Sequence, residues 1–150
     1  MSDSPVSYIQ AFASIITHVA YADGVLVVDE VVSLFEGLEF MLDYASEDEF
    51  RTAITEALQH PIAIDIAGAF LAEYDIADRV QLIEVALSVS LADEDYSFPE
   101  HVTLHEAIGV LFTEEEAPLV ARLLEIGLER AVIEANLGLY DDEFFYDEAN

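Results

Sequence analysis

An internal repeat constrains this chain more than any other feature of its sequence. An Ala-Asp pair whose aspartate is followed seven residues later by a glutamate occurs twice, as Ala22-Asp23 with Glu30 and as Ala92-Asp93 with Glu100. A repeated unit of this size fixes the architecture, because each copy must bury its apolar face against a neighbour. The apolar positions after each glutamate also agree: they are Leu34, Leu38, Met41 and Leu42 in the first copy and Leu104, Ile108, Leu111 and Phe112 in the second.

Apolar residues recur with the spacing of amphipathic helices. Ser14 and Thr17 fall away from the apolar stripe of the first helix, and His18 lies opposite to it, so we expect His18 at the surface. The second copy carries an equivalent stripe. The two stripes are Ile9, Phe12, Ile16 and Val19 in the first copy and Leu82, Ala86 and Val89 in the second.

Capping signals divide the rest of the chain into helices. Ser46 with Glu49 and Thr113 with Glu116 have the sequence of capping boxes. Pro118 would remove a backbone hydrogen bond from a helix that begins at Thr113, so that helix either starts later or is kinked. We therefore predict an all-α fold of about seven helices, with two pseudo-repeats of roughly three helices and one extra helix between them. The helices outside the repeated stripes are expected at about residues 47–60, 62–74 and 113–136.

The charge of the chain excludes several classes of partner. It has 32 acidic residues, four arginines and no lysine, and its formal net charge is −28. Nucleic acids and anionic membrane surfaces are recognised by basic side chains, so neither is an expected partner. Cysteine is absent, which excludes disulfides and thiolate chemistry. The first residues lack the features of a signal peptide, and the most apolar run, Ile62–Leu71, is too short to cross a bilayer, so we expect a cytoplasmic location.

The repeated acids are the candidate metal ligands. Helical spacing places Asp23, Glu30 and Glu100 at or beside the apolar stripes of their helices, facing the inside or the rim of the bundle. A buried carboxylate needs a compensating charge, and the chain has few arginines to supply one. If the two copies pack about a pseudo-twofold axis, Asp23, Glu30, Asp93 and Glu100 converge and can bind Ca²⁺, Mg²⁺ or Mn²⁺. The alternative is structural: the aspartates shape turns, and the glutamates favour helix N-termini.

His101 and His105, one helical turn apart, are possible additional ligands, in which case the ion would be Zn²⁺ or Ni²⁺. Their counterparts in the first copy are Val31 and Phe35, which favours a packing role instead. An EF-hand does not fit, because Phe98 occupies the glycine position of the loop. No Glu-x-x-His motif, nucleophile elbow or phosphate-binding glycine loop occurs, so the chain is not expected to be an enzyme.

The segment from Val19 to Gly24, followed by Glu30, resembles the signature of the tellurite-resistance TerB family, which is similar to the N-terminal domain of a DnaJ-type co-chaperone. Leu91 to Glu94, followed by Glu100, resembles the second half of that signature, although Glu94 replaces a glycine. The resemblance covers about residues 8–130. It implies an all-helical domain of two repeats with metal-binding acids at Asp23, Glu30, Asp93 and Glu100. It also implies a cytoplasmic role in stress responses, within membrane-associated assemblies and without an established catalytic activity.

The expected organisation is one domain at residues 1–139, with repeat halves at about 6–60 and 76–134, and an acidic, aromatic tail at 140–150. The leading hypothesis is a non-enzymatic divalent-metal-binding or sensing module that acts through protein partners in a tellurite or stress response. The alternative is a metal-free acidic domain that docks on basic proteins, and a weaker one is a metal-dependent hydrolase. The tail is expected to dock on this domain or on a partner through Phe144, Phe145 and Tyr146.

Overall fold

The computed structural model describes residues 5–22, 24, 28–43, 45–92 and 97–138, which form seven α-helices and one short 3₁₀-helix without any strand. The predicted all-α class is confirmed, while the twofold relation between its halves stays a prediction. None of the described helices is both long and apolar enough to span a bilayer. The elements are α1 (Pro5–Ala20), α2 (Val28–Gly37), η1 (Glu39–Asp43), α3 (Glu47–Gln59), α4 (Ile64–Leu71), α5 (Ile76–Ser90), α6 (Phe98–Leu111) and α7 (Ala117–Asn136).

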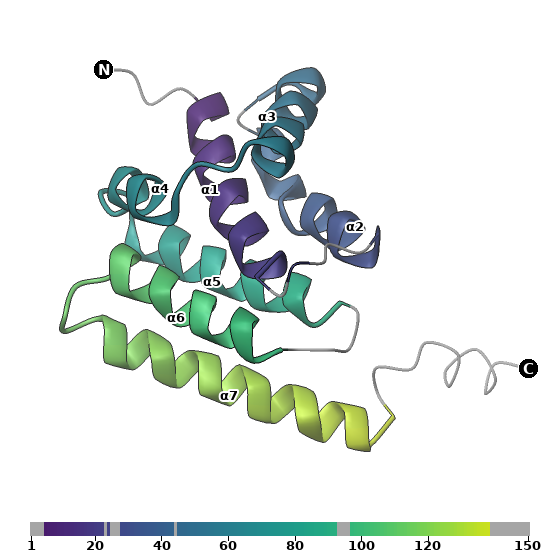
Figure 1. Cartoon of the computed structure of the whole chain (residues 1–150), viewed down its shortest axis with the longest axis vertical. Helices are drawn as coiled ribbons and strands as arrows, with labels where there is room; N and C mark the ends of the chain where they lie inside the picture. The colour runs from purple at the N-terminus through teal and green to yellow at the C-terminus, as the bar shows by residue number, and fades with distance from the viewer. Residues whose placement is uncertain (1–4, 23, 25–27, 44, 93–96, 139–150) are drawn as a thin grey trace, which may run out of the picture.

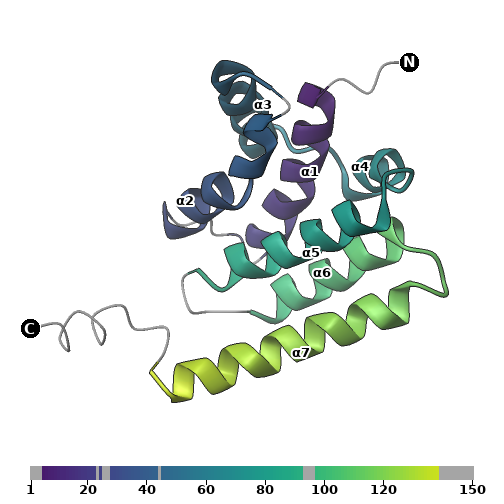
Figure 2. The same ribbon diagram turned by 180° about the vertical axis from the view of Figure 1, so that it is seen from behind.

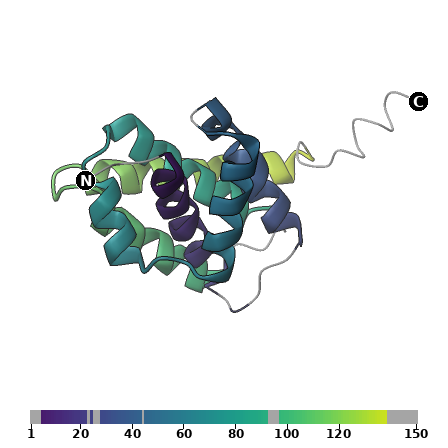
Figure 3. The ribbon, with the colours of Figure 1, turned by 90° about the horizontal axis from the view of Figure 1, so that it is seen from above.

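Helix α1 is the centre of the bundle. It packs against α3 and α4 on one side and against α5 and α6 on the other (Figure 1). Seen from above, it is surrounded by the other helices (Figure 3). Helix α7 forms an outer layer against α6 and α5, on the side of the molecule opposite α3 (Figure 2). The core is therefore built around α1, with α7 added at its edge.

The enclosure of α1 corrects the expected placement of its polar residues. From Ile9 to Ala20 every side chain is buried except Gln10 and His18, which are half-buried. Ser14 and Thr17 tolerate burial because Ser14 Oγ accepts a 3.0 Å hydrogen bond from the Ile62 N–H and Thr17 Oγ1 donates one of 2.8 Å to the Ala13 carbonyl.

The expected surface position of His18 was wrong for a related reason. His18 Nε2 donates a 2.8 Å hydrogen bond to the carbonyl oxygen of Ile62, on the segment that leads into α4. This segment crosses α1 on the side that the apolar stripe leaves open. A single stripe predicts one buried face, whereas α1 has neighbours on all sides.

The helix that follows Glu30 is shorter than the repeat predicted. Helix α2 ends at Gly37, and the chain continues as η1, whereas α6 runs unbroken to Leu111. Met41 remains fully buried, but Leu42 is 38% exposed and does not belong to the core stripe. Gly37 lies close to α5, since a β-carbon there would come within 2.7 Å of Val85 Cγ1.

The predicted capping boxes are present, with one difference in register. Ser46 Oγ accepts from the N–H of Glu49 at 3.2 Å, and Glu49 accepts from the N–H of Ser46 at 3.0 Å. Thr113 and Glu116 make the same reciprocal bonds at 3.1 and 3.0 Å, but α7 begins after them, at Ala117. The predicted later start is confirmed, because it places Pro118 in the first turn of the helix, where a missing N–H costs little.

Arg79 joins three elements at the α4 end of the bundle. Its guanidinium donates hydrogen bonds to the Tyr74 carbonyl at 2.9 Å and the Leu111 carbonyl at 2.8 Å. It also pairs with Glu116 at 3.2 Å and lies over the Phe112 ring. The side chain of Arg79 is 11% exposed, so these contacts connect the start of α5, the end of α6 and the turn before α7 in a largely dry environment.

Gly68 provides a test of the α4–α6 contact. A β-carbon at Gly68 would lie 2.4 Å from Val110 Cγ2, whereas one at Gly109 would meet no atom within 4 Å. We expect Gly68→Ala to destabilise the fold by about 1–3 kcal/mol through overpacking. Gly109→Ala, on an exposed helical face, should stabilise it by about 0.5–1 kcal/mol. Urea unfolding followed by circular dichroism measures both, and equal effects of the two substitutions would contradict this packing.

Glu116 provides a test of the Arg79 network by pH. The Thr113 N–H and the Arg79 guanidinium lower the pKa of the Glu116 carboxyl below its usual value of 4.5. A lowered pKa contributes stability above pH 4.5, and this contribution is lost as the pH falls through the folded-state pKa. Wild type should therefore be more stable than Glu116→Gln at pH 7, and the difference should decrease as the pH falls below 4.5. Glu125→Gln, at an exposed arginine pair, is the control and should show no such trend.

Candidate functional site

The boundaries of the helices coincide in the two copies around the repeated acids. Helices α1 and α5 end at Ala20 and Ser90, which are both three residues before the aspartate of their copy. Helices α2 and α6 begin at Val28 and Phe98, both two residues before the glutamate. The sequence offset of 70 residues is therefore also the offset of these helix ends.

The backbone turns that lead to the aspartates also agree. The N–H of Ala22 donates to the Val19 carbonyl at 3.2 Å, and the N–H of Ala92 donates to the Val89 carbonyl at 3.1 Å. Asp23 and Asp93 themselves lie outside the described residues. The equal geometry up to Ala22 and Ala92 means that the chain leaves α1 and α5 in the same way.

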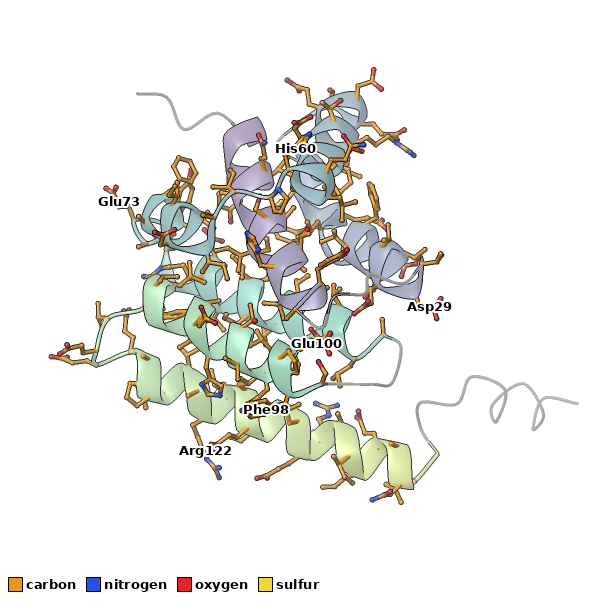
Figure 4. The ribbon with its side chains drawn as sticks, viewed as in Figure 1. Asp29, His60, Glu73, Phe98, Glu100 and Arg122 are labelled. Carbon is orange, nitrogen blue, oxygen red and sulfur yellow. The ribbon has the colours of Figure 1, made fainter. Side chains whose placement is uncertain are left out.

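Glu30 and Glu100 are buried at the third position of their helices. Glu30 is 1% exposed and Glu100 is 0% exposed, whereas most acidic side chains of the described part are exposed. Figure 4 shows Glu100 at the start of α6, on the side facing away from α7, with Phe98 toward α7. The ends of α1 and α5 and the starts of α2 and α6 lie at the same end of the bundle (Figures 1 and 2). The expectation that these glutamates face inward is confirmed.

A capping box holds Glu100 in place. Its Oε1 accepts hydrogen bonds from the N–H of Ser97 at 2.8 Å and from Ser97 Oγ at 3.1 Å, and its own N–H donates to Ser97 Oγ at 3.3 Å. These contacts involve Oε1, and Oε2 of the same carboxylate is buried as well. The position equivalent to Ser97 in the first copy is Val27, which has no side-chain hydroxyl. A reciprocal side-chain cap therefore explains the placement of Glu100 but not that of Glu30.

The arginines of the chain are engaged with other glutamates. Arg79 pairs with Glu116, and the remaining three form pairs with neighbours on their own helices. Each of these salt bridges therefore joins an arginine to a glutamate other than Glu30 and Glu100. The three helix-surface pairs are Arg51 with Glu47, Arg122 with Glu125 and Arg130 with Glu134.

Ser90 is a polar residue at this end that the sequence patterns did not single out. It is fully buried at the last position of α5, and its Oγ has no hydrogen-bond partner among the described residues. Its counterpart in the first copy is Ala20, so the hydroxyl is not needed for packing at this position. A hydroxyl at the apolar face of a helix, three residues before a candidate ligand, is the signal that could have identified it.

His101 and His105 lie against each other on α6. Their ring centroids are 4.5 Å apart in an edge-to-face arrangement. Burial and, to a smaller extent, the charge of His101 lower the pKa of His105, while Glu125 opposes the shift. Neutral imidazole is the form that binds metal ions. In the described part of the chain, however, no group of three or more histidine, aspartate or glutamate side chains is arranged to hold an ion.

The other candidate positions lie apart from the buried glutamates or outside the described residues. Phe144, Phe145 and Tyr146 fall in the latter group. A shallow groove of about 350 Å³ runs between α2 and α5, but neither Glu30 nor Glu100 lines it. The side chains that line it include Ser33, Glu36, Gln81, Glu84 and Ser88.

Comparison with known proteins identifies the family. Residues 10–123 match the family described as tellurite resistance protein TerB, a region that contains all four repeated acids and both α6 histidines. Searches of curated proteins and of solved structures found no match. The family match covers most of the chain and agrees with the resemblance of its two acidic motifs. The chain therefore belongs to the TerB family of tellurite resistance proteins.

Proposed function

We propose that this domain is a non-enzymatic module that binds a divalent cation and acts through protein partners in a tellurite or related stress response. The proposed ligands are Glu30 and Glu100 with Asp23 and Asp93. The observation that carries the proposal is the complete burial of Glu30 and Glu100 at equivalent positions of α2 and α6. Ca²⁺, Mg²⁺ or Mn²⁺ fits a donor set made only of oxygen atoms.

The physical argument rests on the cost of burying charge. A buried carboxylate is expensive unless a cation or several hydrogen bonds compensate it, and two such groups at one end of a bundle add mutual repulsion. The positive ends of the α2 and α6 dipoles offset part of this cost. A divalent cation offsets it more fully, and the net charge of −28 attracts cations to the protein.

Cation binding would also couple the two halves of the chain. The ligands follow α1 and start α2 in one half, and follow α5 and start α6 in the other. An ion shared between them would hold the α1–α2 and α5–α6 connections together at one end of the bundle. Such a connection offers a sensing mechanism, because the surface presented there to a partner depends on whether the ion is bound.

Paired substitutions test the proposed ligands. Glu30→Gln with Glu100→Gln removes both charges, keeps the side-chain size and retains an oxygen acceptor for the Ser97 cap. We expect the affinity for Ca²⁺ or Mn²⁺ to fall by more than about tenfold, measured by calorimetric titration of chelator-treated protein. The stabilisation by cation, about 2.7 kcal/mol at a hundred times the dissociation constant, should disappear with it.

The chain provides a matched control for this experiment. Glu36 and Glu106 occupy equivalent positions later in α2 and α6, and both are exposed. Glu36→Gln with Glu106→Gln removes the same charge and should leave the affinity nearly unchanged. An equal loss in both double variants would indicate diffuse attraction by the acidic surface. Absence of any binding to wild type would favour the alternative, a metal-free acidic domain that docks on basic proteins.

The two α6 histidines are tested by the choice of ion. If His101 and His105 add ligands, replacing both by alanine should weaken Zn²⁺ and Ni²⁺ binding by at least about tenfold. It should leave Ca²⁺ binding intact, because hard cations prefer oxygen ligands. Since the pKa of His105 is lowered, Zn²⁺ binding should persist at pH 6.5. Titrations with Zn²⁺, Ni²⁺ and Ca²⁺ at pH 6.5 and 7.5 measure these affinities. Unchanged Zn²⁺ affinity in the double variant would assign the pair to packing.

A further inference from the structure

Helix α7 carries an exposed apolar stripe on the side that does not face the bundle. Its inner face packs through Val120, Leu124 and Ala131. Among the described residues, six of the fourteen exposed large apolar side chains lie on α7 or at its C-cap. The stripe comprises Leu119, Leu123, Ile126, Ile133 and Leu137, and Arg130 lies on it between Ile126 and Ile133.

The spacing of this stripe is that of a helix with a second partner. Steps of four and three residues alternate from Leu119 through Leu123, Ile126 and Arg130 to Leu137, which is the pattern of a coiled-coil seam. Every apolar member of the stripe is at least 46% exposed, including Ile133 and Leu137 at the end of α7, which are 57% and 63% exposed. A continuous exposed apolar face of this kind marks an interaction surface.

We infer that the C-terminal tail of this same chain folds back along α7 and covers this stripe with Phe144, Phe145 and Tyr146. The tail follows Gly138, whose backbone φ of +75° ends α7 in the left-handed conformation that turns a chain away from a helix axis. A turn at Gly138 is what a tail that folds back along α7 requires.

The length of the tail fits this occupant. Phe144 lies six positions after Gly138, and an extended chain covers about 3.3 Å per residue, or about 20 Å over this distance. A helix rises 1.5 Å per residue, so 20 Å corresponds to about 13 residues of α7, back to about position 125. The aromatic residues can thus reach Ile133 and Ile126.

Charge also favours the tail. Residues 139–150 contain five acidic residues and no basic one. Two of the four arginines of the chain lie on the exposed surface of α7: the side chain of Arg122 is 61% exposed and that of Arg130, on the stripe itself, is 78% exposed. The surface pairs that they form with Glu125 and Glu134 are weak, so the guanidinium groups can also attract tail carboxylates.

The competing occupants are less favourable. A second copy would bring another molecule of net charge −28 against this one, within the range of electrostatic repulsion. A separate protein must compete with a tethered segment, whose effective concentration is in the millimolar range. The family match ends at residue 123, so Ile126, Ile133 and Leu137 of the stripe lie beyond it, as does the tail.

Cysteine crosslinking tests the inference without interference, because the chain has no cysteine of its own. Ile126→Cys with Phe145→Cys places one thiol on the stripe and one in the tail. We expect mild oxidation to form a disulfide within one chain, at a rate independent of protein concentration. This rate should be at least about tenfold higher than the rate for the control pair Thr55→Cys with Phe145→Cys. Thr55 is the control position because it is exposed on α3, across the molecule from α7.

A charge variant tests the second part of the argument. Arg130→Glu should slow the crosslinking of the Ile126 and Phe145 cysteines by repelling the acidic tail, whereas Arg51→Glu on α3 should not. The substituted positions on α3 and α7 are exposed, and circular dichroism checks that each variant folds. A crosslinking rate equal to the Thr55 control would overturn the inference. Disulfide-linked dimers as the main product would also overturn it and would assign the stripe to a second copy.

Discussion

The scarcity of positive charge governs how this protein accommodates its acids. With four arginines for 32 acidic residues, side-chain pairing can neutralise only a few carboxylates, and three of the four arginine pairs lie on exposed helix surfaces where they contribute little. Backbone N–H groups stabilise some of the other carboxylates. Glu49, Glu100 and Glu116 each accept a hydrogen bond from the main chain at the cap of a helix or turn. The single inward arginine, Arg79, supports the junction of α5, α6 and α7.

The packing of α1 determines where the remaining buried carboxylates lie. Because α1 is enclosed by helices of both halves, the chain must leave it at one end of the bundle, where α5 also ends. The connections to α2 and α6 start there, and the third residue of each helix points a carboxylate into the interior. This geometry is compatible with two roles for the helix-terminal acids: binding of a cation between the halves, as proposed above, or a purely structural role. The proposed ion compensates a buried charge that helix dipoles alone offset only in part.

Periodicity and capping predicted most of this fold from sequence. The apolar stripes gave the helix number, and Ser46 with Glu49 gave the start of α3 to the residue. The failures concern neighbours that local patterns do not contain. His18 is half-buried and Ser14 is buried because the segment before α4 crosses α1. Helix α2 ends at Gly37, where the lack of a β-carbon allows the close approach of Val85 on α5. The inward glutamates were predicted from the helical wheel, whereas Ser90 was not singled out, although its position on the apolar face of α5 was a signal of its burial.

The boundary of the family match separates two kinds of feature in this chain. The repeated acids, most of the enclosed α1 and the Arg79 junction as far as Glu116 lie within residues 10–123, the region that matches the family. Most of the exposed stripe on α7 and the aromatic tail lie beyond it. The two regions are physically independent, because the stripe faces away from the bundle and the glutamates face into it. A partner that displaced the tail from α7 would therefore change the outer surface of the domain without disturbing the buried carboxylates.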